Sequence, residues 1–193
     1  MKRLFVLICL VFLGNCLFGQ YQMDIKLTDG TIKSGIYKWG KYRLIDKNRK
    51  EEIKFSEITS FIQQGANGVS NEFHILFYPK RKKLKRSKKA LGWKVHSGEK
   101  IDLFHALFGS QPVHEIIDTK FNLSHLEVFA RRKGEKYVYS LRCRDGIGCQ
   151  GIKKRLIKFF YDCPELLKLI EDDEMDIMNT PEIVKKYEEL CPN

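Results

Sequence analysis

The chain has 193 residues, of which 43% are hydrophobic and 31% charged, and its formal net charge is +11. This composition excludes a disordered chain, a collagen-like fibre and a multi-pass membrane protein, because it can fill a core but contains only one long apolar run. The length fits one domain, or a small domain with an appended module.

Residues 1–19 have the organisation of a secretory signal peptide. A basic start at Lys2 and Arg3 precedes an unbroken apolar stretch at 4–13, and Gly19 offers a small residue at a cleavage position. The stretch is short for a membrane span, which needs about 20 apolar residues. We therefore expect an exported protein of the periplasm, the outer membrane surface or the extracellular space. Two alternatives stay open: a retained membrane anchor, and a lipid anchor at Cys16, which has the leucine and glycine spacing of a bacterial lipoprotein signal.

Most of the positive charge of the expected mature protein lies in one segment, which we call the basic tract. Removing residues 1–19 leaves a net charge of +9, and the basic tract alone contributes +8, whereas residues 165–193 carry −6. Because unpaired charges are costly to bury, we expect the tract to be a solvated loop between two strands. Its cations are Lys80, Arg81, Lys82, Lys83, Lys85, Arg86, Lys88 and Lys89.

The basic tract has two interpretations. It could contact a polyanion, such as anionic lipid, acidic polysaccharide or extracellular nucleic acid. It could equally be a solvated hairpin connection that prevents strands of different molecules from pairing. No aromatic residues alternate with its cations, as stacking on bases would require, so nucleic acid is the least favoured of these partners.

Residues 20–64 are expected to form a small β-roll. Met23, Ile25 and Leu27 alternate with polar residues, a turn signal follows at Asp29 and Gly30, and a return strand is expected at 32–39. Further strands are expected at 42–45, 52–55 and 59–63, with a single turn at 56–58.

This segment resembles the opening of small Sm-like and SH3-like barrels. The resemblance is carried by Leu27, the Asp29-Gly30 turn, Gly35 and a closing strand that contains Ile58 and Phe61. It covers about a quarter of the chain and implies a rolled-sheet shape; we infer nothing about RNA binding from it.

The rest of the chain is expected to change from strands to helices. Residues 65–150 are interpreted as an antiparallel β region, with strands at 72–78, 92–96, 100–107, 125–131 and 136–142. Residues 151–193 show helical spacing, with Pro164 as the first residue of a second helix and Thr180-Pro181 starting a third. We therefore predict an α+β fold, in which an antiparallel body is followed by a helical segment packed on it.

About the last hundred residues resemble uncharacterised exported proteins common in Bacteroidetes-type bacteria. The resemblance is carried by residues 99–104, 128–136, 160–166 and 187–191. It implies an exported location and a frame that runs from Asp162-Cys163-Pro164 to the terminal Cys191, without implying a function.

Four cysteines remain after the expected cleavage, an even number in an oxidising compartment, which predicts two disulfides. We predict the pair Cys163–Cys191, because antiparallel packing would place the start of the second helix beside the end of the third. Cys143–Cys149 is then the other bridge. A zinc site and a catalytic thiol are the alternatives, although the spacings lack the short pairs of zinc modules.

The catalytic motifs of the sequence are weak. Residues 146–151 read GxGxxG between an expected strand and an expected helix, but no second parallel strand follows, so we interpret them as a turn and predict no cofactor and no metal. The sequence favours an exported, non-catalytic envelope protein that binds or scaffolds, with an anionic lipid, a polysaccharide or another envelope protein as its candidate partners. The alternative is an envelope hydrolase with a histidine and acid site. Its candidate residues are His105, His114, Asp102, Glu115 and Asp118.

Overall fold

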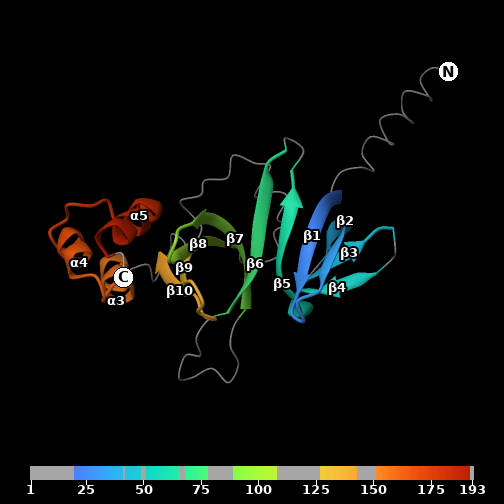
Figure 1. Cartoon of the computed structure of the whole chain (residues 1–193), viewed down its shortest axis with the longest axis horizontal. Helices are drawn as coiled ribbons and strands as arrows, with labels where there is room; N and C mark the ends of the chain where they lie inside the picture. The colour runs from blue at the N-terminus through green and yellow to red at the C-terminus, as the bar shows by residue number, and fades with distance from the viewer. Residues whose placement is uncertain are drawn as a thin grey trace, which may run out of the picture. The chain divides into compact units, whose positions relative to one another are not determined.

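A computed structural model describes residues 20–40, 42–48, 51–65, 68–77, 89–107, 127–142 and 151–191. Within these ranges the chain forms ten β-strands followed by three α-helices (Figure 1). All strand pairs of the two units described below are antiparallel, which confirms the predicted α+β fold. The described residues up to Asn71 belong to one compact unit and those from Glu72 onward to another.

The first unit contains five short strands in the order β5-β1-β2-β3-β4. The turn between the first two strands contains Gly30, whose φ of +90° favours glycine because it has no Cβ. Strands were expected at all five places, and all five are confirmed. They are β1 (Gln20–Leu27), β2 (Ile32–Gly40), β3 (Arg43–Asp46), β4 (Glu52–Lys54) and β5 (Ile58–Gln64), with the single turn η1 (Phe55–Glu57) before β5.

The alternation of apolar residues explains the core of the first unit. Met23 and Ile25 face inward from alternate positions of β1, as a half-buried strand requires, and each of the other strands adds one or two buried apolar side chains. Those that are fully or almost fully buried are Met23, Ile25, Tyr37, Leu44, Ile53, Ile58 and Phe61.

The second unit contains five strands that pair in chain order, from β6 to β10. Its sheet curls, because the backbone N–H of Val138 donates to the carbonyl oxygen of Phe77 at 2.9 Å, which joins the start of β10 to the end of β6. Figure 1 shows these strands following one another around the curl. They are β6 (Ser70–Phe77), β7 (Lys89–Ser97), β8 (Ile101–Leu107), β9 (Glu127–Arg132) and β10 (Tyr139–Arg142).

Three helices pack on one face of this second sheet: α3 (Ile152–Phe159), α4 (Pro164–Glu171) and α5 (Thr180–Leu190). Pro164 is the first residue of α4, as predicted. The helix α5 begins at Thr180, as predicted, and the side chain of its N-cap Asn179 accepts a hydrogen bond from the backbone N–H of Glu182. The shared core includes strand residues Ile101, Leu103, Val128 and Ala130 and, from the helical segment, Leu156, Phe160, Leu166, Ile170, Ile183 and Val184.

A disulfide links Cys163 to Cys191 and confirms the predicted pair. Cys163 is the N-cap of α4 and Cys191 the C-cap of α5, so the bond joins the start of one helix to the end of the other. The predicted Cys143–Cys149 bridge lies outside the described residues. No helix in the described ranges is both long and apolar enough to cross a membrane.

Two polar contacts hold the helices against the sheet. Arg132 of β9 donates to the carboxylate of Asp162 at 2.7 and 2.9 Å, to the Tyr187 hydroxyl at 2.7 Å and to the carbonyl oxygen of Phe159 at 2.8 Å. Glu188 of α5 accepts hydrogen bonds from the backbone N–H groups of residues 100 and 101, at 2.8 and 3.3 Å. Both contacts join segments that are distant in sequence.

Candidate functional site

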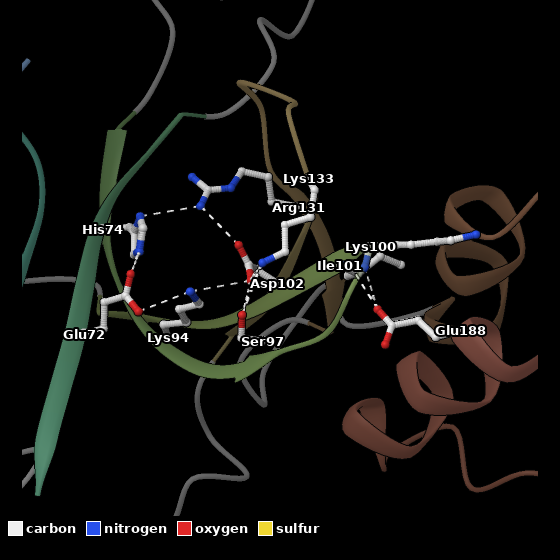
Figure 2. Close-up of polar contacts among 10 residues, drawn as sticks. All are labelled: Glu72, His74, Lys94, Ser97, Lys100, Ile101, Asp102, Arg131, Lys133 and Glu188. Atoms are coloured by element: carbon white, nitrogen blue, oxygen red, sulfur yellow. Dashed lines mark hydrogen bonds and ion pairs between the residues drawn. The ribbon is translucent and has the colours of Figure 1, made fainter. Parts of the chain in front are cut away.

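The face of the second sheet opposite the helices carries a group of charged side chains, which we call the polar cluster. Strand alternation separates the two faces of β8: Ile101 and Leu103 point to the helices, whereas Asp102 and Phe104 point to the inside of the curl. Figure 2 shows these side chains converging inside the curl. The polar cluster consists of Glu72, His74, Lys94, Ser97, Asp102, Arg131 and Lys133.

Asp102 is the centre of the polar cluster and is only 4% exposed. Its Oδ1 accepts hydrogen bonds from Lys133 Nζ at 2.8 Å and from Ser97 Oγ at 3.0 Å. Lys94 Nζ lies 3.6 Å from the same oxygen, and Arg131 Nη2 lies 3.5 Å from Oδ2. Burial opposes ionisation of this carboxyl, but the hydrogen bonds from Lys133 and Ser97 and the positive charges of Lys94 and Lys133 together outweigh it and keep the pKa of Asp102 below its usual value.

His74 and Glu72 form the second half of the polar cluster. His74 Nε2 lies 2.6 Å from Glu72 Oε1, and its Nδ1 lies 3.5 Å from Arg131 Nη2. Burial lowers the pKa of His74 below its usual value, despite the opposing hydrogen bond with Glu72. The ring is therefore neutral at pH 7, which assigns its proton to Nε2 as donor to Glu72 and leaves Nδ1 to accept from Arg131. Lys94 Nζ, 3.1 Å from Glu72 Oε2, connects the two halves.

The polar cluster packs on a group of buried apolar side chains that includes Phe104. The Arg131 guanidinium lies 4.8 Å from the centre of the Phe104 ring, and the His74 ring meets the same ring edge to face at 5.1 Å. Phe104 is fully buried together with Leu76, Ala106, Phe129 and Val138. Stacking on this ring fixes the orientation of the guanidinium.

The polar cluster carries a net charge of +1. Its three cations are Lys94, Arg131 and Lys133, its two anions are Glu72 and Asp102, and His74 is neutral. Ser97 Oγ contacts Asp102 and Lys133 Nζ, and His74 contacts Glu72 and Arg131, so the cluster does not pair the hydroxyl with the imidazole. This arrangement favours the binding of an anion over nucleophilic catalysis.

The basic tract connects the paired ends of two neighbouring strands. Phe77, the last residue of β6, pairs with Lys89, the first residue of β7. The other seven cations of the tract and the side chain of Lys89 lie outside the described residues. Next to these strand ends, Lys136 Nζ lies 5.7 Å from the Phe77 ring and 5.8 Å from the Tyr137 ring, and Tyr137 is 39% exposed.

The histidine and acid site considered from the sequence does not form between His105 and Asp102. The two residues lie on opposite faces of β8, because they are three positions apart in a strand. His105 pairs across the strands with Trp93, whose ring lies 6.1 Å away. His114, Glu115 and Asp118 lie outside the described residues, as do residues 146–150 of the glycine motif.

The described residues contain one group with the spacing of metal ligands: Cys163, Glu165 and Cys191. The two sulfur atoms are bonded to each other, so neither is a thiolate that could bind zinc. The structure therefore supports the disulfide over the zinc alternative for this pair.

Sequence reasoning did not identify the polar cluster. The available signal was the placement of charged residues at positions that alternate with buried ones. In β6, Glu72 and His74 alternate with the buried Phe73 and Ile75, and Asp102 lies between the buried Ile101 and Leu103. A charge at an otherwise apolar, inward-facing position indicates a paired or functional group.

Comparison with protein-family models, with curated proteins and with solved structures finds no match for this chain. The interpretation of its function therefore depends on its own residues.

Proposed function

We propose that the chain is an exported, non-catalytic protein of the cell envelope that binds or scaffolds at an anionic surface through the basic tract. The observation that carries this proposal is the place of the tract in the fold. Its eight cations lie within ten residues. The two strands that the tract connects, β6 and β7, are paired with each other as far as Phe77 and Lys89. Because these cations are close together in the sequence, a single anionic partner could contact all of them.

The residues beside the tract support an interface with lipid or polysaccharide. Lys136 adds a further cation there, and Tyr137 adds an exposed ring with a polar hydroxyl. Tyrosine is enriched at interfaces between a membrane and water, because its ring is apolar and its hydroxyl group is polar. The acidic segment 165–193, with its net charge of −6, would be repelled by the same surface.

The strength of the expected contact follows from the number of charges. Each lysine or arginine close to an anionic membrane contributes about 1 kcal/mol, and this contribution falls off within a Debye length of about 10 Å at 0.1 M salt. Eight adjacent cations are therefore enough for tight binding at low salt. The same contact must weaken steeply as salt increases.

Co-sedimentation of residues 20–193 with vesicles tests the proposal. The vesicles contain phosphatidylglycerol mixed with phosphatidylcholine, or phosphatidylcholine alone, and the salt concentration rises from about 0.05 M to about 0.5 M. We expect binding to the anionic vesicles only, with most of it lost over this salt range. A parallel series with an acidic polysaccharide immobilised on beads shows whether lipid or glycan is the preferred polyanion.

A matched pair of variants separates the basic tract from general charge. One variant replaces the eight cations of the tract by glutamine and should lose binding. The control replaces eight exposed lysines elsewhere by glutamine, so that it has the same net charge, and should keep most of it. Equal loss in both variants, or unchanged binding in the first, would show that the tract is only a solvated connection. The control positions are Lys26, Lys38, Lys47, Lys54, Lys154, Lys158, Lys168 and Lys185.

A further inference from the structure

We propose that the polar cluster binds the carboxylate group of a small acidic ligand, with Arg131 as its main contact and Lys133 as its second. This site lies inside the curl of β6 to β9 and does not involve the basic tract. The proposal therefore stands or falls independently of binding to an anionic surface.

Arg131 is held in place but makes few good hydrogen bonds. A guanidinium has five N–H donors. The contacts of Arg131 with His74 Nδ1 and Asp102 Oδ2 both use Nη2, and both measure 3.5 Å, the outer limit for a hydrogen bond. In the part of the chain that the structure describes, Nη1 and Nε donate to no other group. Figure 2 shows the two dashed lines meeting at one nitrogen, while the second terminal nitrogen points away from Asp102.

The orientation of this guanidinium is fixed before any ligand arrives. It lies 4.8 Å from the buried Phe104 ring, and its side chain is 20% exposed. A planar guanidinium fork matches the two oxygens of a carboxylate. Because the arginine is already ordered, binding costs little further side-chain entropy.

Lys133 adds the second donor. Its side chain is 43% exposed, which makes it the most accessible cation of the polar cluster. Its ammonium has three N–H donors, of which two point to Asp102 Oδ1 and Ser97 Oγ, at 2.8 and 3.2 Å. The third can reach a ligand oxygen that approaches from solvent.

The charge of the polar cluster selects the class of anion. The excess of one positive charge matches a monoanion, which would leave the cluster neutral. A phosphate dianion would bring a second negative charge close to Glu72 and Asp102 and be repelled by them. The geometry and the charge together favour a carboxylate over a phosphate.

Two sources could supply such a carboxylate: a free small acid or an acidic sugar of an envelope polysaccharide. Acetate and D-glucuronate are the probes for these sources, with inorganic phosphate as the comparison. Residues 20–193 are titrated by calorimetry at constant ionic strength, which is kept with sodium chloride. We expect saturable binding of a carboxylate. Binding of both probes assigns recognition to the carboxylate alone, and binding of D-glucuronate alone assigns it to an acidic sugar.

Four variants test which residues are responsible. R131Q should weaken carboxylate binding at least about tenfold, because it removes a charge-assisted pair. R131K keeps the charge but lacks the planar guanidinium, so its affinity for the carboxylate should lie between those of R131Q and the original protein. R43Q is the matched control, since Arg43 pairs with Glu52 at 2.8 Å in the first unit, and should not change binding. K133Q, at an exposed position, should weaken binding about threefold to tenfold even if R131Q fails to fold.

Several results would overturn the proposal. These are the absence of saturable binding of either carboxylate, phosphate binding as tight as that of the carboxylates, an unchanged affinity in both R131Q and K133Q, or an equal loss of affinity in R43Q. The variant with a neutralised basic tract should bind carboxylates normally. Loss of carboxylate binding in that variant would also contradict the proposal, because it would assign the ligand to the tract.

Discussion

Removal of the Cys163–Cys191 disulfide should destabilise the second unit by about 3 to 4 kcal/mol. The two cysteines are separated by 28 positions. For a closed loop of this length, the chain-entropy relation gives about 3.6 kcal/mol at 25 °C. The two helices at its ends have 8 and 11 residues, lengths at which an isolated helix is marginal in water. The bond therefore restrains a segment that is weak without it.

Urea unfolding followed by far-UV circular dichroism measures this effect. Residues 20–193 are used with serines at Cys143 and Cys149, so that a reductant can break only the Cys163–Cys191 bond. With m-values of about 1 to 3 kcal/mol per molar urea, reduction should lower the midpoint of the second unit by about 1 to 4 M. The variant with alanines at Cys163 and Cys191 should unfold at a urea concentration near the midpoint of the reduced protein, and its midpoint should not change when the reductant is added. Coincident unfolding curves with and without reductant would refute this account of the helical segment.

The remaining predictions concern the curled sheet and its contact with the helices. G92A should lower the free energy of unfolding by about 1 to 3 kcal/mol, since its Cβ would lie 2.3 Å from Leu76 Cδ1, and a thermal melt with an unchanged Tm would contradict this. R132M should lower the free energy of unfolding by about 1 to 3 kcal/mol, a range that already allows for solvent screening because Asp162 is 37% exposed. A double-mutant cycle with D162N should show coupling between the two residues. The pKa of His74 is lower in the folded protein than in the unfolded chain, so that on acidification the unfolded chain takes up the proton at a higher pH than the folded protein. The free energy of unfolding should therefore fall as the pH decreases below about 6.5, by at most ~1.4 kcal/mol per pH unit. H74Q should flatten this slope, and an unchanged slope would show that another group titrates there.

The elements of the fold could be predicted because their signals are local. Alternating apolar residues mark β1 and its return strand, and the change to helical spacing after residue 151 marks α3. Pro164 identifies the start of α4 because its ring fits the first turn of a helix. Thr180-Pro181 identifies the start of α5 in the same way, because proline is tolerated in the first turn of a helix, and the preceding Asn179 is a preferred N-cap residue.

The polar cluster could not be predicted because it depends on pairing between distant strands and on a bulge. The register of β7 with β8 shifts between Lys94 and His96. Lys94 pairs with Phe104, and the shift then places Ser97 beside Asp102. With regular pairing, Ser97 would have been placed beside Ile101. The opposite faces of His105 and Asp102, by contrast, follow from strand alternation and were predictable from the sequence.

Cell fractionation is the measurement that tests the central proposal most directly. The full-length chain is expressed in a Gram-negative host, with the original basic tract or with its eight cations replaced by glutamine, and the cysteine at position 16 is replaced by serine in both to exclude a lipid anchor. We predict that the original protein appears in the envelope membrane fraction and is released by a wash with about 0.5 M salt, at which the Debye length falls to roughly 4 Å. The neutralised protein should appear in the soluble periplasmic fraction. Recovery of both proteins in the same fraction, or retention of either in the cytoplasm, would contradict the account.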